Sequence, residues 1–262
     1  MITASDRRFG IEVECLIPDD YRGSFPMGSY HAGSQIPWGP SGWNTQSDGS
    51  IHTVPGYVAA EIVSPPLSGE DGLVQVVFMM DKLSEIGAKV NKSCGFHIHI
   101  DASDLDGDGV NRIKESFINL EPMLFRVNGE NARNRWDNTY CKRSSQWENG
   151  GTTSRYQSLN LTNIFDPSGR TRREGKRTVE FRLYSLHEID AKQAVAMIYT
   201  SVAMVVKSIN DGVMPIPTGD KNSQIRTFVR QNFTDFRCRI IPDAPVWDIV
   251  RPLYQNVKVA TV

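Results

Sequence analysis

Short segments in which apolar residues alternate with charged ones constrain the fold of this sequence more than any other feature. They occur at 9–14, 57–63, 95–100 and 178–183. Successive side chains of a β-strand point to opposite faces, so each segment would place its polar residues on one face of a sheet. That face would carry Glu12, Glu14, Glu61, His97, His99, Glu180 and Arg182. The pattern predicts a sheet with one packed apolar face and one face lined by ionisable groups.

Segments in which apolar residues recur at helical spacing lie between these strands and after the last of them. It predicts helices at about 70–88, 111–127 and 190–210, with a further helix at 223–233. Antiparallel strands with helices packed beneath them indicate an α+β fold. We expect a single domain over 1–262, with long loops at about 18–47 and 128–177.

The composition excludes some classes of function. Charged residues make up 23% of the chain, hydrophobic residues 39%, and the net charge is −1. A general nucleic-acid or membrane-surface binder would need a basic excess. The longest apolar segment, 194–206, is interrupted by polar residues and is too short to cross a bilayer, so we expect a buried helix there.

The sequence also supports expectations about the cellular location of the protein and about the redox state of its cysteines. The residues before the first strand contain no apolar stretch typical of a secretion signal, which favours a cytoplasmic protein. The four cysteines are widely scattered, without metal-binding spacing, and reduced thiols are expected. Cys94 precedes the histidine strand and could act as a nucleophile near His97, whereas a buried structural role is the default for a cysteine.

The shared face of carboxylates and imidazoles predicts a metal site. Glu12 and Glu14 facing the same way would repel each other unless a cation lay between them. Carboxylates with a nearby arginine suit hard divalent ions that bridge phosphate oxygens, which favours Mg²⁺ or Mn²⁺. The pair His97 and His99 also fits a zinc hydrolase, although a third histidine or cysteine at a comparable strand is missing.

A calcium-loop pattern lies after the histidine strand. Its ligand positions are Asp104, Asp106, Asp108 and Glu115. The element before them is predicted to be a strand, whereas a calcium loop of this kind follows a helix. The same residues also suit the turn and N-cap between a strand and a helix without any ion.

Arginines and lysines are frequent in two loops next to the predicted site strands, at 128–157 and 169–177. Most of them are expected to be solvated, and one or two could bind a phosphate. The sequence contains no Gly-x-Ser-x-Gly elbow, Walker A loop or dinucleotide-binding glycine run.

Taken in chain order, the motifs resemble the amidoligase family, over about 8–190. They are Phe9-Gly10-x-Glu12-x-Glu14, Asp48-Gly49-Ser50-Ile51, Glu61 to Leu67, Cys94-Gly95-Phe96-His97-x-His99-x-Asp101, Leu159-Asn160 and Thr178-Val-Glu180-Phe-Arg182. Amidoligases are carboxylate-amine ligases related in fold to glutamine synthetase and glutamate-cysteine ligase. The resemblance implies a glutamine synthetase-like antiparallel sheet that binds ATP and magnesium ions.

The resemblance also implies roles for individual residues. Metal ligands would be Glu12, Glu14, Glu61, His97 and Glu180. Arg182 would meet the ATP phosphates beside His97, while Asp48 and Ser50 would lie near the acceptor substrate. His99, Arg155 and Asn160 would make further contacts with the reactants. After Arg182 the chain departs from the Gly-Thr pair common in the family, which leaves substrate recognition at this edge open.

The expected function is therefore an ATP-dependent ligase that joins a small-molecule or peptide carboxylate to an amine through an acyl phosphate. Within that chemistry Arg182, Asp48 and His99 are the catalytic candidates, and His97, Arg182, Arg155, Asn160 and Ser50 are the nucleotide-binding candidates. A zinc hydrolase and a catalytically silent binding module of the same fold are the alternatives. The sequence does not determine the two substrates or the oligomeric state.

Overall fold

The computed structural model describes residues 7–29, 32–126, 128, 135–136, 138–144, 154–166, 168–172 and 175–216. The helix predicted at 223–233 and Cys238 lie outside the described residues. Within the described part of the chain, no helix is both long enough and apolar enough to cross a bilayer.

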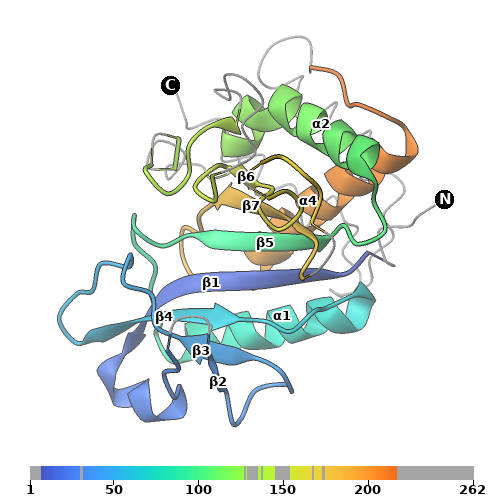
Figure 1. The fold of residues 1–262 in the computed structure, drawn as a ribbon. Coiled ribbons are helices and arrows are strands. Elements are labelled where there is room, and N and C mark those ends of the chain that lie inside the picture. Colours follow the sequence, from blue (N-terminus) through green and yellow to red (C-terminus); the bar gives the residue numbers. More distant parts are fainter. Residues whose placement is uncertain are drawn as a thin grey trace.

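A seven-stranded antiparallel sheet forms the centre of the structure (Figure 1). Its strands are β1 (Phe9–Pro18), β2 (Ser34–Gln35), β3 (Asn44–Gln46), β4 (Tyr57–Val63), β5 (Phe96–Asp101), β6 (Leu159–Asn160) and β7 (Thr178–Tyr184). Their order in the sheet is β2-β3-β4-β1-β5-β7-β6. The central strand β1 pairs with β4 on one side and with β5 on the other.

Three helices accompany the sheet: α1 (Gly69–Glu85), α2 (Gly107–Arg126) and α4 (Ala191–Asn210). Figure 1 shows α1 and α4 behind the sheet, and both α1 and α2 pack against α4. The side chain of Asp190 caps α4 by accepting a hydrogen bond from the backbone N–H of Lys192. Most residues of α4 are buried, so the predicted buried helix is confirmed.

The apolar alternation in the sequence builds the core. The side chains that were predicted to face away from the charged residues are all buried: Ile11, Val13, Phe96, Ile98, Ile100, Val179, Phe181 and Leu183. Burying one such side chain contributes roughly 1.5–3 kcal/mol relative to leaving it in water. This face of the sheet is therefore fixed against the helices, which leaves the opposite face for the ionisable residues.

The prediction of a long loop at 18–47 was wrong in part. It contains a 3-10 helix (Asp19–Ser24), the edge strand β2 and its neighbour β3. Buried Phe25, Ile36 and Trp43 anchor it to the core. Strands of two and three residues leave no periodic signal, and the Gly-, Pro- and Ser-rich composition concealed them.

The other element boundaries differ from the prediction by a few residues. β1 continues to Pro18 instead of ending at 14, and α2 begins at Gly107 instead of 111. The earlier start of α2 has a local cause, because the carboxylate of Asp106 accepts a hydrogen bond from the backbone N–H of Gly109 at 2.7 Å. The loop predicted at 128–177 contains β6 within its described part.

Candidate active site

The pairing of the strands brings the polar residues into a row across one face of the sheet. Glu12 lies opposite His97, His99 opposite Glu180, and Glu14 opposite Glu61. Gln46 on β3 and Asn160 on β6 extend the row, opposite Glu61 and Glu180 respectively. Residues far apart in the sequence therefore meet because of the register of the strands.

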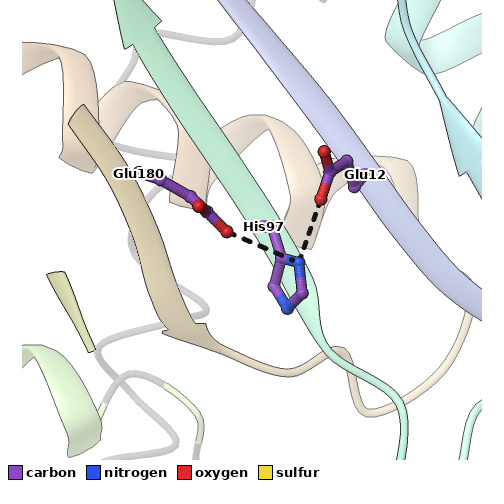
Figure 2. Close-up of side chains that lie close together, drawn as sticks. All are labelled: Glu12, His97 and Glu180. Carbon is purple, nitrogen blue, oxygen red and sulfur yellow. Dashed lines mark hydrogen bonds and ion pairs between the residues drawn. The ribbon is translucent and has the colours of Figure 1, made fainter. Parts of the chain in front are cut away.

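The first cluster consists of Glu12, His97 and Glu180, from β1, β5 and β7. Figure 2 shows the three side chains pointing toward one another. His97 Nδ1 lies 3.2 Å from a carboxylate oxygen of Glu12 and 3.8 Å from one of Glu180. One ligand atom from each residue lies within 4.8 Å of the others, which is close enough for a shared cation.

The second cluster consists of Glu14, Glu61 and His97, and all three residues are buried. His97 Nε2 lies 3.4 Å from Glu14 Oε1, so each ring nitrogen of this histidine faces a different cluster. The backbone N–H of Gly95 donates to Glu14 Oε2 at 2.5 Å, and the side-chain amide of Gln46 donates to Glu61. These hydrogen bonds hold the two carboxylates in place.

Burial and like charge raise the pKa of Glu61. Desolvation has the largest effect, and the nearby carboxylates of Glu12 and Glu14 add to it, so that the pKa reaches about 8. Hard cations prefer carboxylate oxygens, and a cation between the carboxylates would remove their repulsion. The donor set therefore fits Mg²⁺ or Mn²⁺.

Opposite charges meet where His99 lies beside Glu12 and Glu180 of the first cluster. Burial would lower the pKa of His99, but Glu180 and Glu12 outweigh it and raise the pKa to about 9. Burial alone would raise the pKa of Glu12, but the nearby His99 and His97 hold that pKa well below its usual value. A positively charged His99 and ionised carboxylates therefore face one another across the sheet.

Glu180 is held from two sides. Arg182 Nη1 donates to Glu180 Oε1, and Asn160 Nδ2 donates to Glu180 Oε2 at 2.5 Å. Charge-assisted hydrogen bonds of this kind are stronger than neutral ones and fix the direction of a carboxylate. Arg182 is itself only 8% exposed, so its positive charge lies inside the site.

Two adjoining cavities open over this face of the sheet. The larger cavity has a volume of about 610 Å³, and among the predicted site residues its lining includes Glu12, Asp48, Glu61, His97, His99, Arg155, Asn160, Glu180 and Arg182. The smaller cavity has a volume of about 250 Å³, and Glu14 and Ser50 line it. The structure thus brings every predicted site residue to one of the two cavities. Arg8, Lys176 and Arg177 add positive charge to the larger cavity.

The two alternative metal interpretations gain no support. His97 and His99 share neither of the candidate metal clusters found among the described residues. Asp104 instead binds Arg7 at 2.6 Å, and Asp106 caps α2, so these residues of the calcium pattern have partners without an ion. In the described part of the chain, the candidate metal clusters contain none of the calcium-loop residues.

The structure also argues against Cys94 as a nucleophile. Its side chain is 1% exposed. Burial raises the pKa of its thiol to about 11, so very little thiolate forms at neutral pH. A structural role for Cys94 follows.

Three residues of the site did not stand out in the sequence: Gln46, Gly95 and Arg135. Gln46 lies on β3, a strand of three residues with no sequence signal. Gly95 belongs to the family motif, but its contact with His97 depends on the fold. Arg135 was one of many loop arginines, and only the structure separates it from the solvated ones, because it is 2% exposed.

Comparison with known proteins bears on the family of this chain. The family model described as "Putative amidoligase enzyme" matches residues 29–150, which include β4, α1, β5 and α2. The resemblance to amidoligases is confirmed. The matched range contains His97 and Glu61, whereas Glu12 and Glu180 lie outside it. No curated protein matches the chain.

One solved structure supports the fold class. A bifunctional glutathione synthetase from Pasteurella multocida matches with a TM-score of 0.52 and 10% identity, over 97% of this chain and 47% of that one. This chain thus spans about half the length of that protein. A GmaS/ADP complex matches with a TM-score of 0.48 and 12% identity, over 98% of this chain and 71% of that one. The predicted α+β fold, with an antiparallel sheet and helices on its apolar face, is confirmed.

Proposed function

We propose that this chain is an ATP-dependent carboxylate-amine ligase. The observation that carries the proposal is the pair of clusters that share His97 on the polar face of an antiparallel sheet. Each cluster offers two carboxylates beside one imidazole, and carboxylates are the ligands preferred by the hard cations that accompany nucleotide phosphates. The resemblance to amidoligases adds independent support.

The larger cavity suits a nucleotide in size and charge. Its volume of about 610 Å³ falls within the range of small-molecule sites, roughly 300–1,000 Å³. Arg182, which is paired with Glu180 of the first cluster, lines it together with Lys176 and Arg177. These cations would bind the phosphates of ATP, and Arg155 and Asn160 would contact the same ligand.

The two clusters would hold Mg²⁺ or Mn²⁺. Glu12 and Glu180 would bind one ion, and Glu14 and Glu61 would bind another. A neutral His97 would coordinate one of the two through its unprotonated ring nitrogen, while the other ring nitrogen donates a hydrogen bond. When bound, such ions offset the negative charge of the phosphate oxygens and so reduce repulsion between ATP and a substrate carboxylate.

The reaction follows from the charges around this cavity. An oxygen of the acid substrate attacks the γ-phosphorus of ATP, the bond to the β-γ bridging oxygen breaks, and ADP leaves. Arg182 would stabilise the charge that develops on the transferred phosphoryl group. The amine then attacks the carbonyl carbon of the acyl phosphate and phosphate leaves, while Asp48 would accept the proton that the amine loses. His99, whose pKa the carboxylates of Glu180 and Glu12 raise, would orient these two residues.

Calorimetric titration tests the nucleotide site. A non-hydrolysable ATP analogue is titrated with Mg²⁺ into the wild type, Glu12→Ala, and the matched control Glu85→Ala on the exposed end of α1. Binding should require Mg²⁺, be lost in Glu12→Ala and be retained in Glu85→Ala. Absence of Mg²⁺-dependent binding in the wild type would refute the proposal.

A second measurement separates a ligase from a silent binding module. Hydroxylamine is a small nucleophile that traps acyl phosphates, so it can replace the unknown amine. A ligase should release ADP when a suitable acid from a panel of small-molecule and peptide carboxylates is added with hydroxylamine, whereas a silent module would bind the nucleotide and release none.

A further inference from the structure

Two polar side chains, Thr178 and Asn163, lie beside the first cluster without belonging to it. Thr178 is the first residue of β7, Asn163 lies in the turn after β6, and both line the larger cavity. Asn163 Nδ2 donates a hydrogen bond to Thr178 Oγ1 at 2.9 Å. Thr178 Oγ1 in turn lies within hydrogen-bond distance of His99 Nδ1, at 3.3 Å. The three side chains therefore form a hydrogen-bonded chain that ends at the imidazole.

The His99 ring is hydrogen-bonded through Nδ1 and not through Nε2. Nε2 lies 3.1 Å from Glu12 Oε1, but it has no aligned hydrogen-bond partner among the described residues. Nδ1 has such a partner in the Thr178 hydroxyl. A hydroxyl can both donate and accept, so Thr178 can bind Nδ1 in either protonation state of the ring. The direction in which Nε2 faces Glu12 is thus set from the Thr178 side.

His99 borders one of the two oxygens of the Glu12 carboxylate. The other oxygen, Oε2, lies 3.2 Å from His97 Nδ1. The carboxylate therefore lies between two imidazoles, with one ring at each oxygen. A rotation of the His99 ring would remove the neighbour of Oε1 and allow the carboxylate to turn away from the first cluster.

The turn that carries Asn163 also supports the other carboxylate of the first cluster. Asn160 Nδ2 donates to Glu180 Oε2 at 2.5 Å. Its Oδ1 accepts hydrogen bonds from the backbone N–H and the hydroxyl of Thr162, at 2.9 and 2.8 Å. The turn therefore reaches both carboxylates of the first cluster, one directly and the other through His99.

We propose that Thr178 and Asn163 are positioning residues of the first cluster, which orient the His99 ring and, through it, the carboxylate of Glu12. The inference rests on the metal sites of the proposed function. Removing a group that orients a metal ligand typically lowers metal affinity by roughly 10- to 100-fold. The amide of Gln46 and a backbone N–H support the second cluster instead, so the two positioning residues should act on one cluster only.

Manganese binding by variants of equal shape tests the inference. Mn²⁺ alone is titrated by calorimetry into the wild type, Thr178→Val and Asn163→Leu, in which methyl groups replace the hydrogen-bonding atoms. Both variants should lose affinity for one ion by about tenfold, and Thr178→Ser, which keeps the hydroxyl, should bind like the wild type. The controls Thr53→Val and Asn111→Leu make the same replacements at exposed positions outside both cavities and should leave binding unchanged.

A spectroscopic measurement separates an effect on His99 from a general loss of structure. The ring nitrogen resonances of the histidines are recorded by NMR in the metal-free protein, and those of His99 are assigned with His99→Gln. Thr178→Val should shift the His99 Nδ1 resonance, because a methyl group cannot hydrogen-bond the ring, and should leave the His187 resonances unchanged. Asn163→Leu keeps the sequence of β7, so it tests the inference even if Thr178→Val fails to fold.

Wild-type Mn²⁺ affinity in both Thr178→Val and Asn163→Leu would overturn the inference, as would unchanged His99 resonances in Thr178→Val. Equal losses in Thr178→Ser and Thr178→Val would also overturn it, because the hydroxyl would then have no part in the effect. None of these results would touch the ligase proposal, which nucleotide binding tests separately. A wild type that binds no Mn²⁺ would refute the proposed metal sites, and the His99 resonances would then decide alone whether Thr178 orients the ring.

Discussion

His97 connects the two carboxylate clusters through a single imidazole ring. Nδ1 lies 3.2 Å from Glu12 and Nε2 lies 3.4 Å from Glu14. The ring is 2% exposed, so its position depends on its neighbours and on the space left by Gly95. Small displacements of this ring would disturb both clusters together.

Gly95→Ala should therefore impair the site although it adds one methyl group. The new Cβ would lie 2.6 Å from His97 Nε2, so the imidazole or the strand has to move. We expect Mg²⁺-dependent nucleotide affinity to fall by about tenfold or more, since displacements of about 1 Å are costly at such sites. Calorimetry measures the change. The control is Gly107→Ala, where a Cβ meets no heavy atom within 4 Å, and this variant should bind the nucleotide normally. Normal binding by Gly95→Ala would contradict the role given to His97.

Arg182→Lys tests whether a point charge suffices. Lysine cannot reproduce the planar guanidinium, which contacts Glu180 through Nη1 while the Tyr140 carbonyl accepts from Nε at 3.5 Å. We expect acid-dependent ADP release to fall by about a hundredfold, the usual cost of losing a positioned hydrogen-bond donor to a transition state. The control Arg170→Lys, at an exposed position, should be unaffected. A rate within about threefold of the wild type in Arg182→Lys would refute this role.

At the scale of elements, α2 is joined to the segment that leads into β6 by a buried carboxylate. Glu121 is 0% exposed and accepts hydrogen bonds from the backbone N–H of Ser144 at 2.5 Å and from the hydroxyl of Ser158. Ser158 directly precedes β6, which carries Asn160. The helix therefore helps to position a residue that holds Glu180 in the site.

Glu121→Ala should lower the free energy of unfolding by about 3 kcal/mol, because two buried donors lose their carboxylate acceptor. Denaturation in urea measures the loss, with Glu115→Ala on the exposed face of the same helix as the matched control. The control should change stability by less than about 0.5 kcal/mol. Equal stability of the two variants would show that the Glu121 contacts are dispensable.

The sequence predicted the elements that have a period and missed those that depend on partners. β1, β4, β5 and β7 follow from alternation, and the three helices follow from apolar spacing. β3 forms because residues of β4 are available to pair with it, and β2 pairs in turn with β3, which no local pattern reveals. The start of α2 depends on the Asp106 cap, within a stretch of Asp and Gly that is also typical of turns.

The site residues, like the helices and strands, could be predicted only in part. Alternation placed Glu12, His97 and Glu180 on one face, but their meeting depends on the register of three strands. The position of Arg135 could not be predicted, because it is set by a contact with the backbone of Arg182. The metal and nucleotide roles of these residues remain predictions.

At the scale of the whole molecule, the charged sheet face should make stability depend on pH. The pKa of Glu61 is raised from 4.5 to about 8, so its favourable contribution is present below pH 4.5 and is lost as the pH rises through about 8. The pKa of His99 is raised from 6.5 to about 9, so its contribution is present below pH 6.5 and is lost through about pH 9. Both groups therefore lower the stability of the folded protein as the pH rises above 7.

The melting temperature of the metal-free protein should therefore fall between about pH 6 and pH 9. Thermal unfolding in the presence of a chelator measures this, and added Mg²⁺ should raise the melting temperature more at pH 9 than at pH 6, because protons and metal compete for Glu61. Glu61→Gln should flatten the decline. A melting temperature that rises with pH would contradict the charge arrangement.

The central place of β1 in the sheet also bears on how the chain reaches its native state. β1 lies near the start of the sequence, yet its partner β5 follows α1, and β7 follows much later. Such non-local pairings pay their loop-closure entropy before they gain contacts, so folding should be slow compared with that of a helical bundle of similar size. During synthesis, Glu12 and His97 leave the ribosome long before Glu180. The first cluster therefore cannot form until β7 has emerged and paired with β5, and the nascent chain carries an unpaired edge of β5 until then.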